Sequence, residues 1–276
     1  MTKNTKKNRR RGRPKKTERQ DALDKAPVVA LDRGLRVLLH LADSHGATLT
    51  EVSVEIGAPV ATVHRILTTL KFRGMAEFSR KENRWFVGPQ AFSAGNAYLD
   101  RSNISEIAKP VLRRLAEKTG ETANLGIETD GELVYLLQVE SQNPIRASFK
   151  TGASGNIHCS GIGKAMLAHM DGSRVDDIIV EQGLPKLTPK TICDAGQLAA
   201  ELRQVRKQGW AIDDEERSAG MRCVAAPIYN SVDVVVAGVS VSGPTHRFGD
   251  ERLEEIAREV MQSAKLISTG LKTSSQ

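Results

Sequence analysis

Small polar side chains recur in the second half of the chain at spacings that suit the binding of a compact anion. Ser240 and Ser242 lie two residues apart in an apolar run typical of a β-strand, so their side chains point to one face. Cys223 lies on the preceding strand-like run, and Asp213 lies in the turn before that run. Residues 161–163, Gly-Ile-Gly, begin a helical pattern whose first N–H groups have no acceptor within the helix. Hydroxyls and free amides together predict a site for a small carboxylate.

Each of these residues also has a purely structural interpretation. A strand serine that faces inward is often a core hydroxyl with its hydrogen bonds satisfied. A buried cysteine is more often a small apolar side chain than a ligand contact. The four side chains therefore predict a pocket as a set rather than singly.

Patterns that would indicate an enzyme are incomplete. The glycines at 161 and 163 precede Lys164, but His158 stands where a phosphate loop has its first glycine, and Ala165 replaces the hydroxyl residue that would hold Mg²⁺. The six histidines show no metal-ligand spacing. No motif orients a base against Cys159 or Ser160. We expect neither an enzyme, nor a metal, nor a cofactor.

A second group of polar side chains lies on a predicted helix over residues 60–72, opposite an apolar stripe with i, i+3, i+4, i+7 spacing. A shorter helix over 49–56 precedes it, with a Gly-Ala-Pro break between them, which indicates a helix-turn-helix. A small helical core with a polar surface is the alternative. The exposed face suits the major groove because its side chains are short, polar or basic: Ala61, Thr62, His64, Arg65, Thr68 and Thr69.

The residues after this helix predict a β-hairpin wing over 74–88, whose basic residues Arg80, Lys81 and Arg84 suit contact with phosphates. The first 25 residues carry eleven Lys or Arg and three Asp or Glu, whereas the whole chain has a net charge of +7. This basic arm predicts a nucleic-acid partner. Arg11 and Arg13 flank Gly12 in an AT-hook-like segment suited to an A·T-rich minor groove, and a merely electrostatic tail is the alternative.

A length of 276 residues allows two domains, and we expect four segments. They are a disordered arm over 1–27, a winged helix-turn-helix over 28–88, a linker helix over 89–101 and an α+β domain over 102–272. Strand-like runs at 123–127, 133–139, 145–149, 222–228 and 232–241 alternate with helical stretches. The sequence offers no membrane span and no signal-peptide core, and its three cysteines show no disulfide pattern, so we expect a cytoplasmic protein.

Together these segments resemble the IclR family of bacterial transcriptional regulators over nearly all of residues 28–272. The resemblance is carried by Ala-Leu-Asp-Arg-Gly-Leu at 30–35, Ala-Thr-Val-His-Arg-Ile-Leu at 61–67 and His-Cys-Ser-Gly-Ile-Gly-Lys-Ala-Met-Leu at 158–167. It continues in Gly-Trp-Ala-Ile-Asp-Asp-Glu-Glu at 209–216 and Cys-Val-Ala-Ala-Pro-Ile at 223–228. Trp-Phe-Val-Gly at 85–88 departs from the family's Tyr-x-Leu-Gly but stays apolar, and the basic arm lies outside the shared pattern.

This resemblance implies a GAF-like effector domain, double-stranded promoter DNA as partner, and a homodimer that frequently pairs into a tetramer. The glyoxylate-sensing members, which include the allantoin-regulon repressor, hold their ligand with the residue types found here. The implied contacts are Asp213, Cys223, Ser240, Ser242 and the amides of Gly161 and Ile162. The predicted effector is a small 2-oxo acid, glyoxylate above all. A competing hypothesis is an architectural DNA-binding protein whose C-terminal domain only oligomerises.

Overall fold

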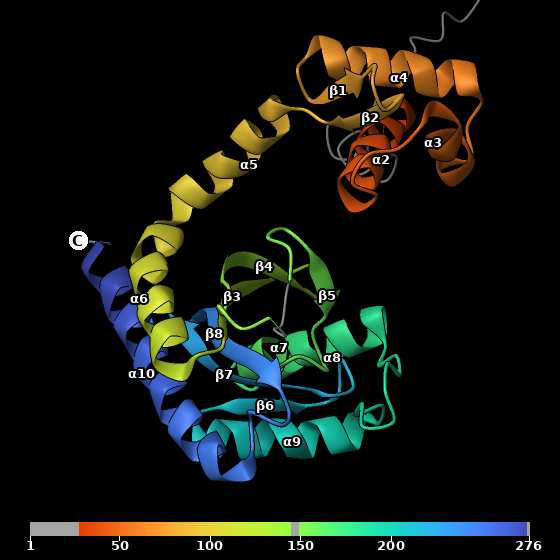
Figure 1. The fold of residues 1–276 in the computed structure, drawn as a ribbon. Helices are drawn as coiled ribbons and strands as arrows, with labels where there is room; N and C mark the ends of the chain where they lie inside the picture. Colours follow the sequence, from red (N-terminus) through yellow and green to blue (C-terminus); the bar gives the residue numbers. More distant parts are fainter. Residues whose placement is uncertain (1–27, 145–148, 275–276) are drawn as a thin grey trace, which may run out of the picture. The chain divides into compact units, whose positions relative to one another are not determined.

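A computed structural model describes residues 28–144 and 149–274 (Figure 1). Arg11, Arg13 and the whole predicted basic arm lie outside the described residues, as does most of the strand predicted over 145–149. The chain divides after Ala97, within helix α5 (Pro89–Ser102), into two compact units.

The N-terminal unit is a winged helix-turn-helix. Its buried side chains come from every element, with Val37, Val63, Leu67 and Trp85 among them, and the Trp85 ring lies 5.0 Å from that of Phe78 across the hairpin. The elements are α2 (Val29–Asp43), α3 (Leu49–Ile56), α4 (Val60–Phe72), β1 (Ala76–Ser79) and β2 (Arg84–Val87). The helices predicted over 49–56 and 60–72 are thus present as α3 and α4.

The start of α3 has a capping box at Thr48. The Thr48 hydroxyl accepts from the N–H of Glu51 (3.3 Å), and the Glu51 carboxylate accepts from the N–H of Thr48 (2.8 Å). This pair satisfies two amides that the helix itself cannot. Gly57 ends α3 at a φ of 64°, which favours glycine and sets the sharp turn into α4.

The C-terminal unit is an α+β domain around a six-stranded antiparallel sheet of order β5-β4-β3-β8-β7-β6. Its strands are β3 (Thr122–Thr129), β4 (Glu132–Val139), β5 (Ser154–Asn156), β6 (Ala211–Asp214), β7 (Met221–Tyr229) and β8 (Val235–Pro244). Its helices are α6 (Ile104–Thr119), α7 (Gly161–Leu167), α8 (Gly172–Gln182), α9 (Ala195–Gln208) and α10 (Asp250–Ser274).

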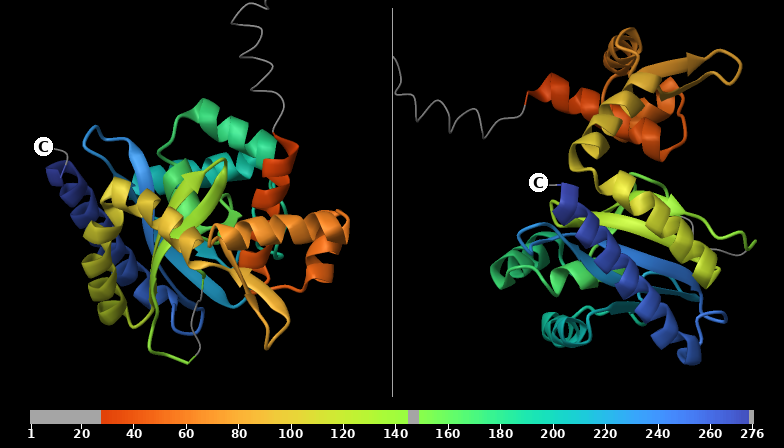
Figure 2. Two further views of the ribbon diagram at one scale, coloured as in Figure 1. Left: turned by 90° about the horizontal axis from the view of Figure 1, so that it is seen from above. Right: turned by 90° about the vertical axis from the view of Figure 1, so that its left-hand side faces the viewer.

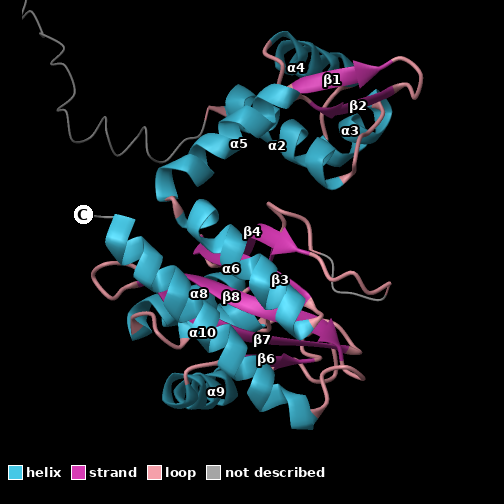
Figure 3. Cartoon of the chain, turned by 60° about the vertical axis from the view of Figure 1, so that its left-hand side comes forward, coloured by secondary structure: helices cyan, strands magenta, loops and turns pink. Residues whose placement is uncertain are grey.

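Helices cover both faces of this sheet. Helices α6 and α10 pack on one face, where residues such as Leu112, Val241 and Val260 form the larger core (Figures 2 and 3). Helices α7, α8 and α9 pack on the other face, around Met166 and Leu202. The predicted α+β class is confirmed, and two short strands, β5 and β6, were not predicted. None of the described helices combines the length and the apolar composition needed to cross a bilayer.

Candidate functional site

The polar residues singled out from the sequence lie in one row across the sheet. Asp213 on β6 pairs with Cys223 on β7, and Cys223 pairs in turn with Ser242 on β8. Ser240, two residues from Ser242, shares its face. The expectation that Asp213 lies in a turn is wrong, because four residues here pair with β7 as a strand. That pairing brings Asp213 directly beside Cys223.

The hydroxyl groups of this row have a partner that sequence reasoning missed. The amide nitrogen of Asn124, on β3, donates to the hydroxyl oxygens of Ser240 (3.4 Å) and Ser242 (3.3 Å). Both oxygens act as acceptors there, and each hydroxyl keeps one proton that it can donate. Burial raises the pKa of the Cys223 thiol to about 11, with Asp213 adding to the rise and the two serines opposing it. The thiol is therefore neutral at physiological pH.

Asp213 holds the turn that follows β6 and is itself protonated readily. Its Oδ1 accepts from the backbone N–H groups of Glu216 (2.8 Å) and Arg217 (3.2 Å). Burial raises the pKa of Asp213 to about 7, although these two hydrogen bonds lower it. A carboxyl group poised near neutrality can take either charge state when a ligand arrives.

Helix α7 begins against the same row. A Cβ added to Gly161 would lie 3.0 Å from the Cys223 sulfur, so glycine allows the helix to approach the sheet this closely. Ser160 caps the helix by accepting from the N–H of Gly163 (3.0 Å). Gly161 and Ile162 are the first two residues, so their amides have no acceptor within the helix. The Ile162 side chain is core, packed near Gly126 and Gly238, so only its backbone is available to a ligand.

A buried ion cluster ties α7 to the turn after β6. Lys164 is 1% exposed and pairs with Glu216 and, at 3.0 Å, with Glu201 of α9. Burial lowers the pKa of Lys164, but the two carboxylates outweigh it and leave that pKa raised. This ion cluster thus holds helix α7 to the turn after β6, and both of these elements border the row.

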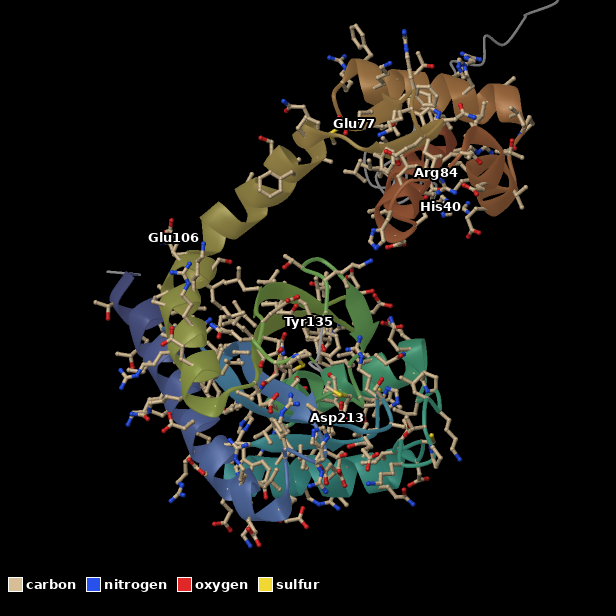
Figure 4. All side chains as sticks on the ribbon, in the orientation of Figure 1. His40, Glu77, Arg84, Glu106, Tyr135 and Asp213 are labelled. Carbon is tan, nitrogen blue, oxygen red and sulfur yellow. The ribbon has the colours of Figure 1, made fainter. Side chains whose placement is uncertain are left out.

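Two further residues beside the row were also missed: Tyr135 on β4 and Arg217 in the turn after β6. Figure 4 labels Tyr135 and Asp213 inside this unit. The Arg217 guanidinium donates to the Tyr135 hydroxyl (2.8 Å). No local motif marks either residue, because strand order alone brings β4 and the β6–β7 turn together. Within residues 28–144 and 149–274, no three His, Cys, Asp or Glu side chains gather as a metal site requires.

The predicted DNA-facing residues of α4 lie on its outer side. Ala61, His64, Arg65 and Thr68 are exposed, and Thr62 is half-buried. The Thr68 hydroxyl donates to the carbonyl of His64 (2.8 Å), which leaves its oxygen able to accept. The exposed face is therefore free to lie against a duplex.

Among the residues that the structure describes, two of the three predicted wing cations, Arg80 and Lys81, have no ion-pair partner. Arg80 and Lys81 are exposed at the turn between β1 and β2. Arg84 donates to the carbonyl of Gly46 (2.7 Å) and pairs with Glu51 (3.2 Å), so it braces the wing against the helices. This internal role differs from the phosphate contact predicted for Arg84.

Comparison with known proteins identifies the family. The model of the IclR helix-turn-helix domain matches residues 30–80, and the model of the bacterial transcriptional regulator IclR C-terminal domain matches residues 96–269. The chain belongs to the IclR family. It is 44% identical over 264 residues to the HTH-type transcriptional regulator BhcR of Paracoccus denitrificans, covering 95% of each chain. It is 33% identical over 264 residues to the HTH-type transcriptional repressor AllR of Escherichia coli K12, covering 95% of this chain and 96% of AllR.

The fold of this IclR-family protein matches that of a solved relative. The crystal structure of the Thermotoga maritima IclR aligns with a TM-score of 0.73 at 27% identity, over 89% of this chain and 100% of that one. The protein is therefore a DNA-binding transcriptional regulator with a C-terminal effector-binding domain, as the sequence predicted. The AllR match also supports the predicted resemblance to allantoin-regulon repressors.

Proposed function

We propose that this cytoplasmic regulator senses a small 2-oxo acid, glyoxylate above all, in the row on the sheet of its C-terminal domain. The observation that carries the proposal is the direct cross-strand register of Asp213, Cys223 and Ser242, with Ser240 on the same face. These side chains are small, and α7 closes over them at Gly161. Such a site favours a ligand of few atoms over a large aromatic acid.

Each residue has a role that follows from its chemistry. The amides of Gly161 and Ile162 donate to the carboxylate of the acid. The Ser240 and Ser242 hydroxyls donate to its oxygens, and their orientation is fixed by Asn124. Asp213 accepts from the hydroxyl of the hydrated aldehyde. Cys223 lines the site as a neutral thiol.

DNA reading is proposed for the outer face of α4. Thr62, His64, Arg65 and Thr68 with Ala61 lie in the major groove, and Arg80 and Lys81 contact phosphates. The basic arm, with Arg11 and Arg13, adds salt-dependent attraction. An effector that binds one arrangement of the protein better shifts the population toward it and so changes the fit of paired recognition helices to a two-fold operator.

The proposed assembly is a homodimer, further paired into a dimer of dimers. Helix α2 and its preceding residue expose apolar side chains at 51% or more of their area, a feature that monomers avoid. They are Val28, Val29, Leu31, Leu35 and Leu39. A hollow of about 440 Å³ between α2 and α4, lined by Leu31, Ile66 and Leu70, lies next to them. A second copy of this helix would cover the stripe.

A thermal melt with a panel of 2-oxo acids tests the effector. At a hundredfold excess over Kd, glyoxylate should stabilise the protein by about 2.7 kcal/mol. For a chain of this size that corresponds to a rise in melting temperature of about 5–10 °C. Combined Ser240→Ala and Ser242→Ala should remove the rise, because two hydroxyl donors to the acid are lost.

Ser231→Ala, in the exposed turn between β7 and β8, is the matched control and should keep the full response. A panel in which no small acid shifts the melt would favour an architectural protein whose C-terminal domain only oligomerises. A full response in the double serine variant would place the ligand elsewhere.

A further inference from the structure

Arg217 is a half-buried cation beside the effector row. Its guanidinium lies 5.3 Å from the ring centre of Tyr135 and 4.9 Å from that of Phe149, and these two rings stack at 4.5 Å. One of its nitrogens donates to the Tyr135 hydroxyl at 2.8 Å. The pair of stacked rings and one hydroxyl thus hold the guanidinium in place.

The surrounding backbone is built to admit this side chain. A Cβ on Gly155, in β5, would lie 2.7 Å from an Arg217 nitrogen and 3.0 Å from the guanidinium carbon, so glycine here accommodates the guanidinium in its observed position. Asp213 fixes the start of the side chain by accepting from the N–H of Arg217 (3.2 Å). Both the backbone and the guanidinium of Arg217 are therefore held in position.

Arg217 has no carboxylate partner among the described residues, unlike Arg174, Arg222 and Arg247, which all pair with acids. Burial raises the pKa of the Cys223 thiol, and the charge of Arg217 opposes this rise, so that charge acts on the row. A guanidinium held in place close to the hydroxyls of the row has the charge and the planar donor geometry to bind a small anion.

We propose that Arg217 is the counter-ion of the effector carboxylate and sets the preference for an acid over a neutral aldehyde. This inference rests on the proposed function and adds to it a specificity-determining residue. The acid lies between the guanidinium and the serine hydroxyls, with its charge neutralised by Arg217 and its oxygens held by the hydroxyls and the α7 amides. The Tyr135 and Phe149 rings limit its size on the outer side.

The test compares glyoxylate with its uncharged amide by isothermal titration calorimetry on the full chain. Arg217→Gln removes the charge but keeps a donor for Tyr135. Loss of a charge-assisted hydrogen bond should weaken glyoxylate binding about 10- to 100-fold. Binding of the amide should change less than about 3-fold, so the ratio of the two affinities falls. Arg203→Gln, an exposed site on α9, removes the same charge elsewhere in the domain and should leave the ratio unchanged.

A ligand-free melt shows whether each variant folds. If Arg217→Gln does not fold, Arg217→Lys takes its place, because it keeps the charge without the planar fork and should lower the ratio several-fold. An unchanged ratio in the folded variant, with glyoxylate bound by the wild-type chain, would overturn the role of Arg217 and leave the proposed function standing. A wild-type chain that binds no 2-oxo acid would overturn both.

Discussion

Replacing Asp213 with asparagine is expected to remove about 4 kcal/mol of pH-dependent stability between roughly pH 4 and pH 7. Burial raises the pKa of this carboxyl to about 7, above its ordinary value of 3.8. The folded protein therefore keeps a proton that the unfolded chain has released. The stabilisation is fully present below the unfolded pKa and is lost as the pH rises through about 7. Urea unfolding at a series of pH values measures it.

Asparagine keeps the oxygen that accepts from Glu216 and Arg217, so the turn should survive the change. Asp214→Asn is the matched control, because hydrogen bonds from Arg222 lower the pKa of its neighbour Asp214. The contribution of Asp214 to stability is present above its unfolded pKa and is lost as the pH falls. Its pH dependence is therefore opposite in sign to that of Asp213. Parallel pH profiles for the wild-type and Asp213→Asn chains would show that Asp213 is not buried as described.

The same carboxyl links effector binding to pH. An anion bound beside Asp213 favours its protonated form, so glyoxylate affinity should fall as the pH rises through about 7. This dependence should disappear in Asp213→Asn, which carries no charge at any pH.

Removing the ammonium group of Lys164 should have a comparably large effect on stability. Lys164→Ala leaves Glu216 and Glu201 without their shared cation, at a side chain that is 1% exposed. Breaking a buried ion pair from one side costs about 3–5 kcal/mol. Burial already raises the pKa of Glu216, and Lys164 is the group that opposes it. The free energy of unfolding in urea measures the loss.

Lys118→Ala provides the comparison, because Lys118 pairs with Glu259 at 2.7 Å on the surface. Such exposed pairs contribute about 0–1 kcal/mol, so this variant should stay close to the wild type. Combined Lys164→Met and Glu216→Gln removes both charges and should recover much of the loss. If Lys164→Ala were as stable as Lys118→Ala, the cluster would not hold α7 to the β6–β7 turn.

Local pattern was sufficient to predict the DNA-binding unit. The stripe on α4 is bounded by Pro59 and by Gly74 close after its end, so the predicted helix has the observed bounds. The capping box at Thr48 was also readable, since Glu51 follows it by three residues. Local pattern did not predict β6, whose four residues include two acids and are held as a strand by pairing with β7.

Local pattern likewise predicted only some residues of the proposed effector site. The two-residue spacing of Ser240 and Ser242 is enough to predict that their side chains lie on one face of a strand. Asn124, Tyr135 and Arg217 enter the site only because β3 pairs with β8 and β4 pairs with β3, and nothing near them in the sequence specifies that order. The internal contacts of Arg84 were not predicted for a similar reason, because its partners Gly46 and Glu51 are more than 30 residues away.

Selection of duplexes from a random-sequence pool, by protein lacking residues 1–27, tests the central claim that the outer face of α4 reads base edges. The wild-type face should enrich one two-fold symmetric sequence. Arg65→Ala should bind that sequence about 10- to 100-fold more weakly, the range expected for a lost base contact. Equal recovery of all duplexes by protein with Arg65 intact would show that the outer face of α4 does not read base edges.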